Sequence, residues 1–222
     1  MSDGGRPALP HALADGLAHP EIARLAAALA ARPGRPARIH PDDRPPRHAA
    51  VALVLRLRED GTPELLFVKR AEYEGDPWSG HVAFPGGRAE PDDATPWDTA
   101  ARETWEETGL ELRRDGLLLG TLDDLYPRNP ALPAIVVRPH VALAAPGPLV
   151  LSDELAAAFW VPIRRFGEPG FATTSTVQAR GHALTVPSFV HDGHTIWGMT
   201  HRIVEQLLER WPPAPRTGPD GE

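Results

Sequence analysis

The sequence lacks cysteine, which excludes disulfide frameworks, thiolate zinc sites and cysteine nucleophiles. It also lacks an apolar run near the roughly 18 residues that a membrane span needs, and its N-terminus has no basic segment followed by a long apolar stretch. The 23 basic residues are outnumbered by 30 acidic ones, so a formal charge of −7 gives no general attraction to nucleic acid. We therefore expect a cytoplasmic protein that binds neither membranes nor nucleic acid.

The composition is that of an ordinary globular protein, with 41% hydrophobic and 24% charged residues in 222 positions. A chain of this length forms one sizeable core with appendages. We expect an N-terminal helix and Pro-rich linker in residues 1–47, one main domain in 48–212 and a disordered tail in 213–222. The helix is predicted over 21–32, where apolar residues recur at helical spacing among alanines.

Within the main domain, two runs at 49–57 and 64–68 predict paired strands, because Asp60-Gly61 between them is a turn signal. Periodicity predicts three further strands, at 117–122, 135–143 and 159–162. It also predicts a C-terminal helix at 199–211. Strands flanked by good helices favour an α/β fold, an α/β/α sandwich around a mixed β-sheet with an extra N-terminal helix.

One helix is marked at both ends. Thr95 supplies an N-cap, Pro96 the first helical position, Asp98 an acid in the first turn, and Gly109 the stop. The sequence thus predicts a helix from Thr95 to Thr108.

This helix carries a cluster of acids. Residues three and four apart share a helix face, so Glu103, Glu106 and Glu107 crowd together. Such crowding is unfavourable unless a cation neutralises it, and hard oxygen ligands suit Mg²⁺ or Mn²⁺. The alternative is a solvated acidic face, which is what most Glu-rich helices are. Arg102, four residues before Glu106, permits an ion pair that leaves Glu103 and Glu107 to face the metal.

A rigid turn precedes the helix. Phe84-Pro85-Gly86-Gly87 allows its backbone to approach a ligand closely, since glycine has no Cβ. A carbonyl there, such as that of Gly86, is a further candidate metal ligand.

The acidic run resembles the signature of the Nudix hydrolases. Arg102-Glu103-Thr104-Trp105-Glu106-Glu107-Thr108-Gly109-Leu110 fits its second half, with Thr104 in place of an aliphatic residue. In the first half, counting from Gly87 reaches Asp93 instead of Glu, and the spacer to Arg102 is one residue longer than usual. The resemblance implies metal-dependent hydrolysis of a P–O–P bond.

Within that family, the chain resembles the coenzyme A pyrophosphatase-like branch. The same longer spacer occurs there, and the likeness extends to the segments 80–87, 120–125 and 196–200. That branch usually carries Arg-Ser followed by a second Arg before the turn, whereas Arg70 here precedes Ala71 and Glu72-Tyr73-Glu74. The resemblance implies coenzyme A or acyl-coenzyme A as substrate.

Other residues around these motifs allow either a functional or a structural interpretation. Arg70 and His81 are candidates for holding phosphates, and the alternative is a surface arginine and a half-buried histidine. Glu154 sits where related enzymes often have an acid that positions or deprotonates water, or else it has a capping or solvent role. The segment 191–194 could suggest a metal pair of His191 and His194, but we interpret it as a hairpin turn at Asp-Gly.

The sequence thus predicts a Nudix diphosphatase acting on a small-molecule nucleoside diphosphate derivative. Coenzyme A or acyl-coenzyme A is the first candidate substrate. The alternative substrates are ADP-ribose, a dinucleotide or a nucleoside triphosphate. Glu103, Glu106, Glu107 and Gly86 are the candidate metal ligands, and Gly86 and Gly87 also contact substrate. A non-catalytic nucleotide-sensing module is the rival from another class. The Ala-rich helix 21–32 allows packing on the domain or exchange within a homodimer.

Overall fold

The computed structural model describes residues 11–41, 43–73, 79–127, 133–179 and 182–212. The tail predicted to be disordered at 213–222 lies outside them, as does the segment 1–10. The helices are α1 His11–Ala18, α2 Pro20–Ala31, α3 Pro96–Thr108, α4 Leu112–Asp115 and α5 Gly198–Leu208, with a 3₁₀ helix η1 at Ile163–Gly167. None of the helices in the described ranges is long and apolar enough to cross a membrane.

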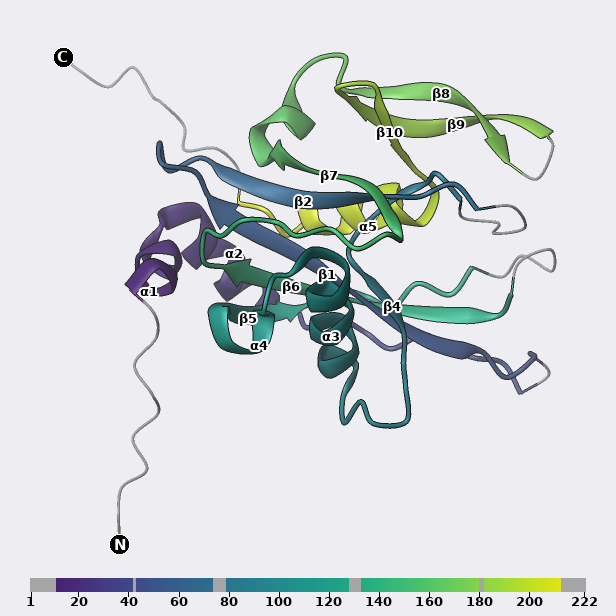
Figure 1. The fold of residues 1–222 in the computed structure, drawn as a ribbon, viewed down its shortest axis with the longest axis horizontal. Coiled ribbons are helices and arrows are strands. Elements are labelled where there is room, and N and C mark those ends of the chain that lie inside the picture. Colours follow the sequence, from purple (N-terminus) through teal and green to yellow (C-terminus); the bar gives the residue numbers. More distant parts are fainter. Residues whose placement is uncertain (1–10, 42, 74–78, 128–132, 180–181, 213–222) are drawn as a thin grey trace, which may run out of the picture.

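The strands form two sheets (Figure 1). The larger contains β1 Arg47–Leu57, β2 Pro63–Arg70, β3 Val82–Ala83, β4 Gly86–Arg88, β5 Gly116–Thr121, β6 Ile135–Ala144 and β7 Leu155–Pro162. The smaller contains β8 Ala172–Ala179, β9 His182–His191 and β10 His194–Trp197.

The larger sheet is mixed, as predicted. β1 lies at its centre and pairs parallel with β6, while its pairings with β2 and β4 are antiparallel. A parallel neighbour requires a crossover, and this crossover contains β4, α3 and β5. The helix with the acid cluster is thereby held against the middle of the sheet.

Alternate residues of β1 face opposite sides of the sheet, because side chains alternate along a strand. Ala50, Ala52 and Val54 pack with Ala100 and Ala101 of α3. The small alanines let this helix lie close to the sheet. The predicted α/β/α sandwich is confirmed, since the opposite face is covered by other helices.

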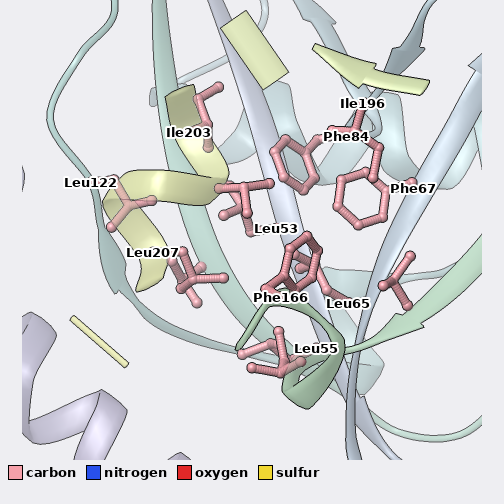
Figure 2. Close-up of a cluster of buried hydrophobic side chains, with 14 of the residues drawn as sticks. Leu53, Leu55, Leu65, Phe67, Phe84, Leu122, Phe166, Ile196, Ile203 and Leu207 are labelled. Atoms are coloured by element: carbon pink, nitrogen blue, oxygen red, sulfur yellow. The ribbon is translucent and has the colours of Figure 1, made fainter. Parts of the chain in front are cut away.

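The opposite face carries the larger core. Leu53 and Leu55 of β1 meet Phe67 of β2 there, together with Ile203 and Leu207 of α5 (Figure 2). All five side chains are at most 2% exposed. Fully burying side chains of this kind contributes about 1.5–3 kcal/mol each.

Two helices, not the single one predicted, precede the linker. α2 buries Ile22, Leu25 and Leu29 in the large core, and α1 adds Leu13. The N-terminal helices therefore pack on the main domain of the same chain. β1, the first strand, begins at Arg47.

The Pro-rich segment after α2 forms no helix or strand where it is described, as expected, but it is firmly attached. Asp123 accepts hydrogen bonds from the Arg35 backbone at 3.0 Å and from its guanidinium at 2.7 Å. Asp124 accepts from the Ala37 amide at 3.0 Å and pairs with Arg138. The two aspartates after β5 thus fasten the linker to the sheet.

The predicted hairpin at 191–194 is confirmed. His194 pairs with His191, and both turn residues have left-handed backbones, with φ of 47° at Asp192 and 79° at Gly193. These values suit a type I′ turn, whose twist matches that of the strands. The segment is therefore a hairpin turn, as we interpreted it. The third strand of this sheet, β8, was not predicted.

Candidate active site

Helix α3 has the boundaries that its sequence indicates. The Thr95 hydroxyl oxygen accepts a hydrogen bond from the Asp98 amide at 3.2 Å, and Pro96 occupies the first turn. Gly109 is left-handed and donates to the Trp105 carbonyl at 2.8 Å. Capping at both ends makes α3 a rigid support for the acids on its surface.

Gly86 and Gly87, predicted as part of a rigid turn, lie instead in strand β4 and pair with Val51 and Ala50 of β1. Glu107 is buried next to this strand, with 5% of its surface exposed. Its carboxylate accepts a hydrogen bond from the Gly86 amide at 3.0 Å. Burial raises the pKa of Glu107 to about 8, the Gly86 hydrogen bond opposes that rise, and the neighbouring charge of Glu103 adds to it. A bound cation would stabilise the charged form of this carboxyl group.

Glu103 lies against the other glycine of this strand. A Cβ on Gly87 would stand 2.4 Å from the Glu103 carboxyl carbon, so a larger residue there would push this carboxylate aside. On Gly86, which has φ of 147°, a Cβ would stand 2.4 Å from the Ala50 carbonyl oxygen. Glycine is therefore required at position 86 by the backbone, whereas at position 87 it leaves room for Glu103.

The environment of Glu103 is less closed than that of Glu107. Burial raises its pKa, and Arg102 opposes the rise through its charge and a 3.1 Å hydrogen bond. Glu106, with a side chain 47% exposed, accepts from the same Arg102 at 3.0 Å. The predicted pair of Arg102 with Glu106 is thus present, but Arg102 contacts Glu103 as well.

Arg102 also joins the helix to the loop before it. Its guanidinium donates two hydrogen bonds to Asp93, at 3.1 and 3.0 Å, and one to the Arg88 carbonyl at 3.1 Å. Those contacts hold the pKa of Asp93 well below its usual range. Asp93 therefore anchors the arginine, a role that the sequence did not predict because nine residues separate the partners.

Two other predicted residues lie within electrostatic range of the acids. The positive charge of Arg70 lowers the pKa of Glu107, while Glu154 raises those of Glu103 and Glu107. Arg70 comes from the end of β2 and Glu154 from the turn before β7, and these strands are paired. Charges from three elements, namely α3, β2 and the turn before β7, therefore act together on Glu107.

His81 contacts both Arg70 and the smaller sheet. Its ring meets the edge of Trp197 at 4.7 Å between centroids, and its carbonyl accepts from the Arg70 amide at 3.0 Å. It stands beside Arg70 along the sheet, where its side chain packs against the second sheet.

The donor set suits a divalent cation. Glu103 and Glu107 are two acids whose pKa values are raised, mainly by burial and further by neighbouring acids, and a cation bound to them would oppose both effects. No group of three His, Cys, Asp or Glu residues in the described part of the chain is placed to hold a metal ion alone. Mg²⁺ is usually held by one or two carboxylates, with water and phosphate oxygens completing its shell.

A mixed sheet with a capped acidic helix packed next to two glycines is typical of a class of hydrolases that act on phosphate compounds. The comparison with protein families leads to the same class. Residues 46–179 match the NUDIX domain, and the chain belongs to the Nudix family as a Nudix hydrolase. The NUDIX domain of Shewanella oneidensis NrtR, solved with ADP ribose, has the same fold, with a TM-score of 0.50 and 16% identity. That match covers 83% of this chain and 97% of the other.

Curated relatives are more similar in sequence. The chain is 33% identical to mitochondrial coenzyme A diphosphatase NUDT8 of Mus musculus, over 72% of this chain and 77% of that protein. It is 31% identical to its Homo sapiens counterpart, with coverages of 72% and 68%. The Nudix hydrolase NudL of Photorhabdus laumondii is 32% identical, with coverages of 74% and 84%. The chain thus resembles a coenzyme A pyrophosphatase-like branch and acts on a nucleoside diphosphate derivative.

Proposed function

We propose that this Nudix hydrolase cleaves the diphosphate of coenzyme A or an acyl-coenzyme A, giving 3′,5′-ADP and a 4′-phosphopantetheine product. The observation that carries the proposal is the 33% identity to a coenzyme A diphosphatase over most of both chains. The electrostatic effect of Arg70 on Glu107 adds support, since a cation within range of the acids can also attract a phosphate.

Nudix hydrolases generally use divalent metal ions. We infer that Glu103, Glu107 and the Gly86 carbonyl would hold Mg²⁺ or Mn²⁺ here. Such an ion, when bound, neutralises the diphosphate and lowers the pKa of a coordinated water.

The chain's own residues have separate proposed tasks. Arg102 keeps Glu106 and Glu103 in place through its two hydrogen bonds, and Asp93 in turn orients Arg102. Arg70 balances the negative charge near Glu107 and contacts a phosphate oxygen of the substrate. Glu154 accepts a proton from the attacking water.

The test is product analysis by mass spectrometry across coenzyme A, dephospho-coenzyme A, ADP-ribose, a dinucleoside polyphosphate and a nucleoside triphosphate, each with Mg²⁺ or Mn²⁺. We expect 3′,5′-ADP from coenzyme A, at a kcat/KM above that for the other compounds. ADP-ribose preferred by about tenfold, equivalent to roughly 1.4 kcal/mol of transition-state discrimination, would contradict the proposal.

Recognition of the 3′-phosphate gives a sharper test. Arg70, Lys69 and His81 are the local cationic candidates, and dephospho-coenzyme A should be the poorer substrate because it lacks this group. Arg70→Ala should narrow the difference between the two compounds, whereas Arg58→Ala, at an exposed turn, should not. Equal rates on both compounds for the unaltered protein would argue against coenzyme A as the physiological substrate.

A further inference from the structure

A short segment before β7, residues 152–154, is fastened to two elements of the site by three successive residues. The Ser152 amide donates to the Glu107 carbonyl at 3.0 Å, which attaches the segment to α3. The Asp153 carbonyl accepts from the Tyr73 hydroxyl at 3.0 Å. The Glu154 carbonyl accepts from the Ala71 amide at 2.8 Å. The segment therefore bridges the acid helix and the chain that follows β2.

A bulge lies at the same place. Lys69 pairs with Ala157, but its neighbour Arg70 pairs with Leu155, so β7 carries one extra residue. Bulges locally interrupt pairing and re-aim side chains, and they are frequent beside active sites. Glu154 lies just beyond this bulge, where single contacts with Ala71 and Tyr73 replace the regular ladder.

Tyr73 supplies a contact of this kind. Its amide donates to the Ser79 hydroxyl oxygen at 2.8 Å, which fixes the residue, and its hydroxyl reaches across to Asp153. The side chain is about half exposed. It is therefore not a core residue, and its hydrogen bond is the one of the three that a side-chain substitution removes.

We propose that Tyr73 is a positioning residue, whose hydroxyl holds Glu154 in range of Glu103 and Glu107. This inference rests on the proposed function in one respect, namely that Glu154 serves the reaction. Tyr73 stands in the Arg-Ala-Glu-Tyr-Glu segment, where the chain departs from the Arg-Ser pattern of the similar branch. The segment that differs from the branch thus supplies the Tyr73 contact with Asp153.

The test is a double-mutant cycle between Tyr73→Phe and Glu154→Gln, measured on the full chain. Tyr73→Phe keeps the ring and removes only the hydroxyl, so its effect isolates the hydrogen bond. Tyr126→Phe, at the other tyrosine of the chain, is the matched control. We expect Tyr73→Phe to lower kcat about fivefold to tenfold, with KM and the melting temperature nearly unchanged. In the Glu154→Gln background the same change should alter kcat less than twofold.

A second measurement does not depend on turnover. Mn²⁺ binding, followed by electron paramagnetic resonance, should weaken in Glu154→Gln, because this acid contributes to the negative potential at Glu103 and Glu107. Tyr73→Phe should weaken it less, and the double variant no more than Glu154→Gln alone. These binding measurements do not depend on the substrate. A failure of the proposal for Tyr73 can therefore be told apart from a failure of the proposed coenzyme A activity.

Three results would overturn the proposal. Equal effects of Tyr73→Phe in both backgrounds would mean that the hydroxyl acts independently of Glu154. Full activity in Tyr73→Phe with loss in Tyr73→Ala would assign the role to the ring. Unchanged kcat and Mn²⁺ binding in Glu154→Gln would remove the acid that Tyr73 is said to position.

Discussion

The Glu107 carboxylate and the Gly86 amide form a 3.0 Å hydrogen bond that joins positions 21 residues apart. This one contact couples the acid helix to the start of β4, so the strand is held by the same group that is proposed to bind metal. Occupation of the site and the conformation of the chain at Gly86 therefore depend on each other.

Removing charge from either acid should separate activity from folding. We expect Glu103→Gln and Glu107→Gln to lower kcat at least about 100-fold, because the amides cannot replace carboxylates as cation ligands. Folding should persist, since the change relieves repulsion. Steady-state kinetics at saturating Mg²⁺ and circular dichroism check this, with Glu59→Gln at an exposed turn as control. Near-normal rates in both variants would refute the metal assignment.

The raised pKa of Glu107 sets a pH dependence of stability for the metal-free protein. The folded state keeps its proton up to about pH 8, whereas the unfolded chain loses it near pH 4.5. Stability from this group is therefore complete below about pH 4.5 and lost as pH rises towards 8. Relative to wild type, Glu107→Gln should gain up to about 1.4 kcal/mol per pH unit across that window. Urea unfolding at several pH values measures the difference, and a constant difference would contradict it.

The same pKa predicts proton release when metal binds. Below pH 8 the metal must displace a proton from Glu107, so Mn²⁺ affinity should rise with pH and level off above about 8. Calorimetric titration in two buffers of different ionisation enthalpy counts the protons released. In Glu107→Gln this release should fall, and an unchanged count would assign the proton to another group.

The linker attachment should matter to stability. Asp123 pairs with Arg210, whose side chain is 2% exposed, as well as with Arg35. Asp123→Ala leaves the buried Arg210 charge without this partner, which should cost about 3–5 kcal/mol of unfolding free energy. The comparison is Asp115→Ala, because Asp115 pairs with Arg114 on the surface and should not shift the unfolding midpoint. Equal midpoints for both variants would show that the contact with Arg210 is dispensable.

The sequence predicted the elements whose ends carry strong local signals. Thr95, Pro96 and Gly109 act within a few residues, so the limits of α3 followed directly from them. Asp60-Gly61 and Asp192-Gly193 likewise placed two hairpins correctly. In these cases the backbone preference of one or two residues decides the local structure.

Other parts depend on tertiary contacts. β8 was missed because its threonines, serine and glutamine show no alternation of apolar and polar residues. α1 was missed because its buried residues gain their partners only from α2 and the sheet. The grouping of Glu103 and Glu107 was expected from helix geometry, but the approach of Arg70 and Glu154 depends on the pairing of β2 with β7.

The parallel pairing of β1 with β6 also has a consequence for the order of folding. The hairpin of β1 and β2 closes a short loop, whereas β6 reaches β1 only after β4, α3 and β5 have all been synthesised. Longer loops cost more entropy to close, so we expect this pairing to follow the hairpin. On the ribosome, the acid helix would gain its full support from the sheet when β6 emerges and inserts, and the catalytic centre would be completed only later, when Glu154 and β7 follow.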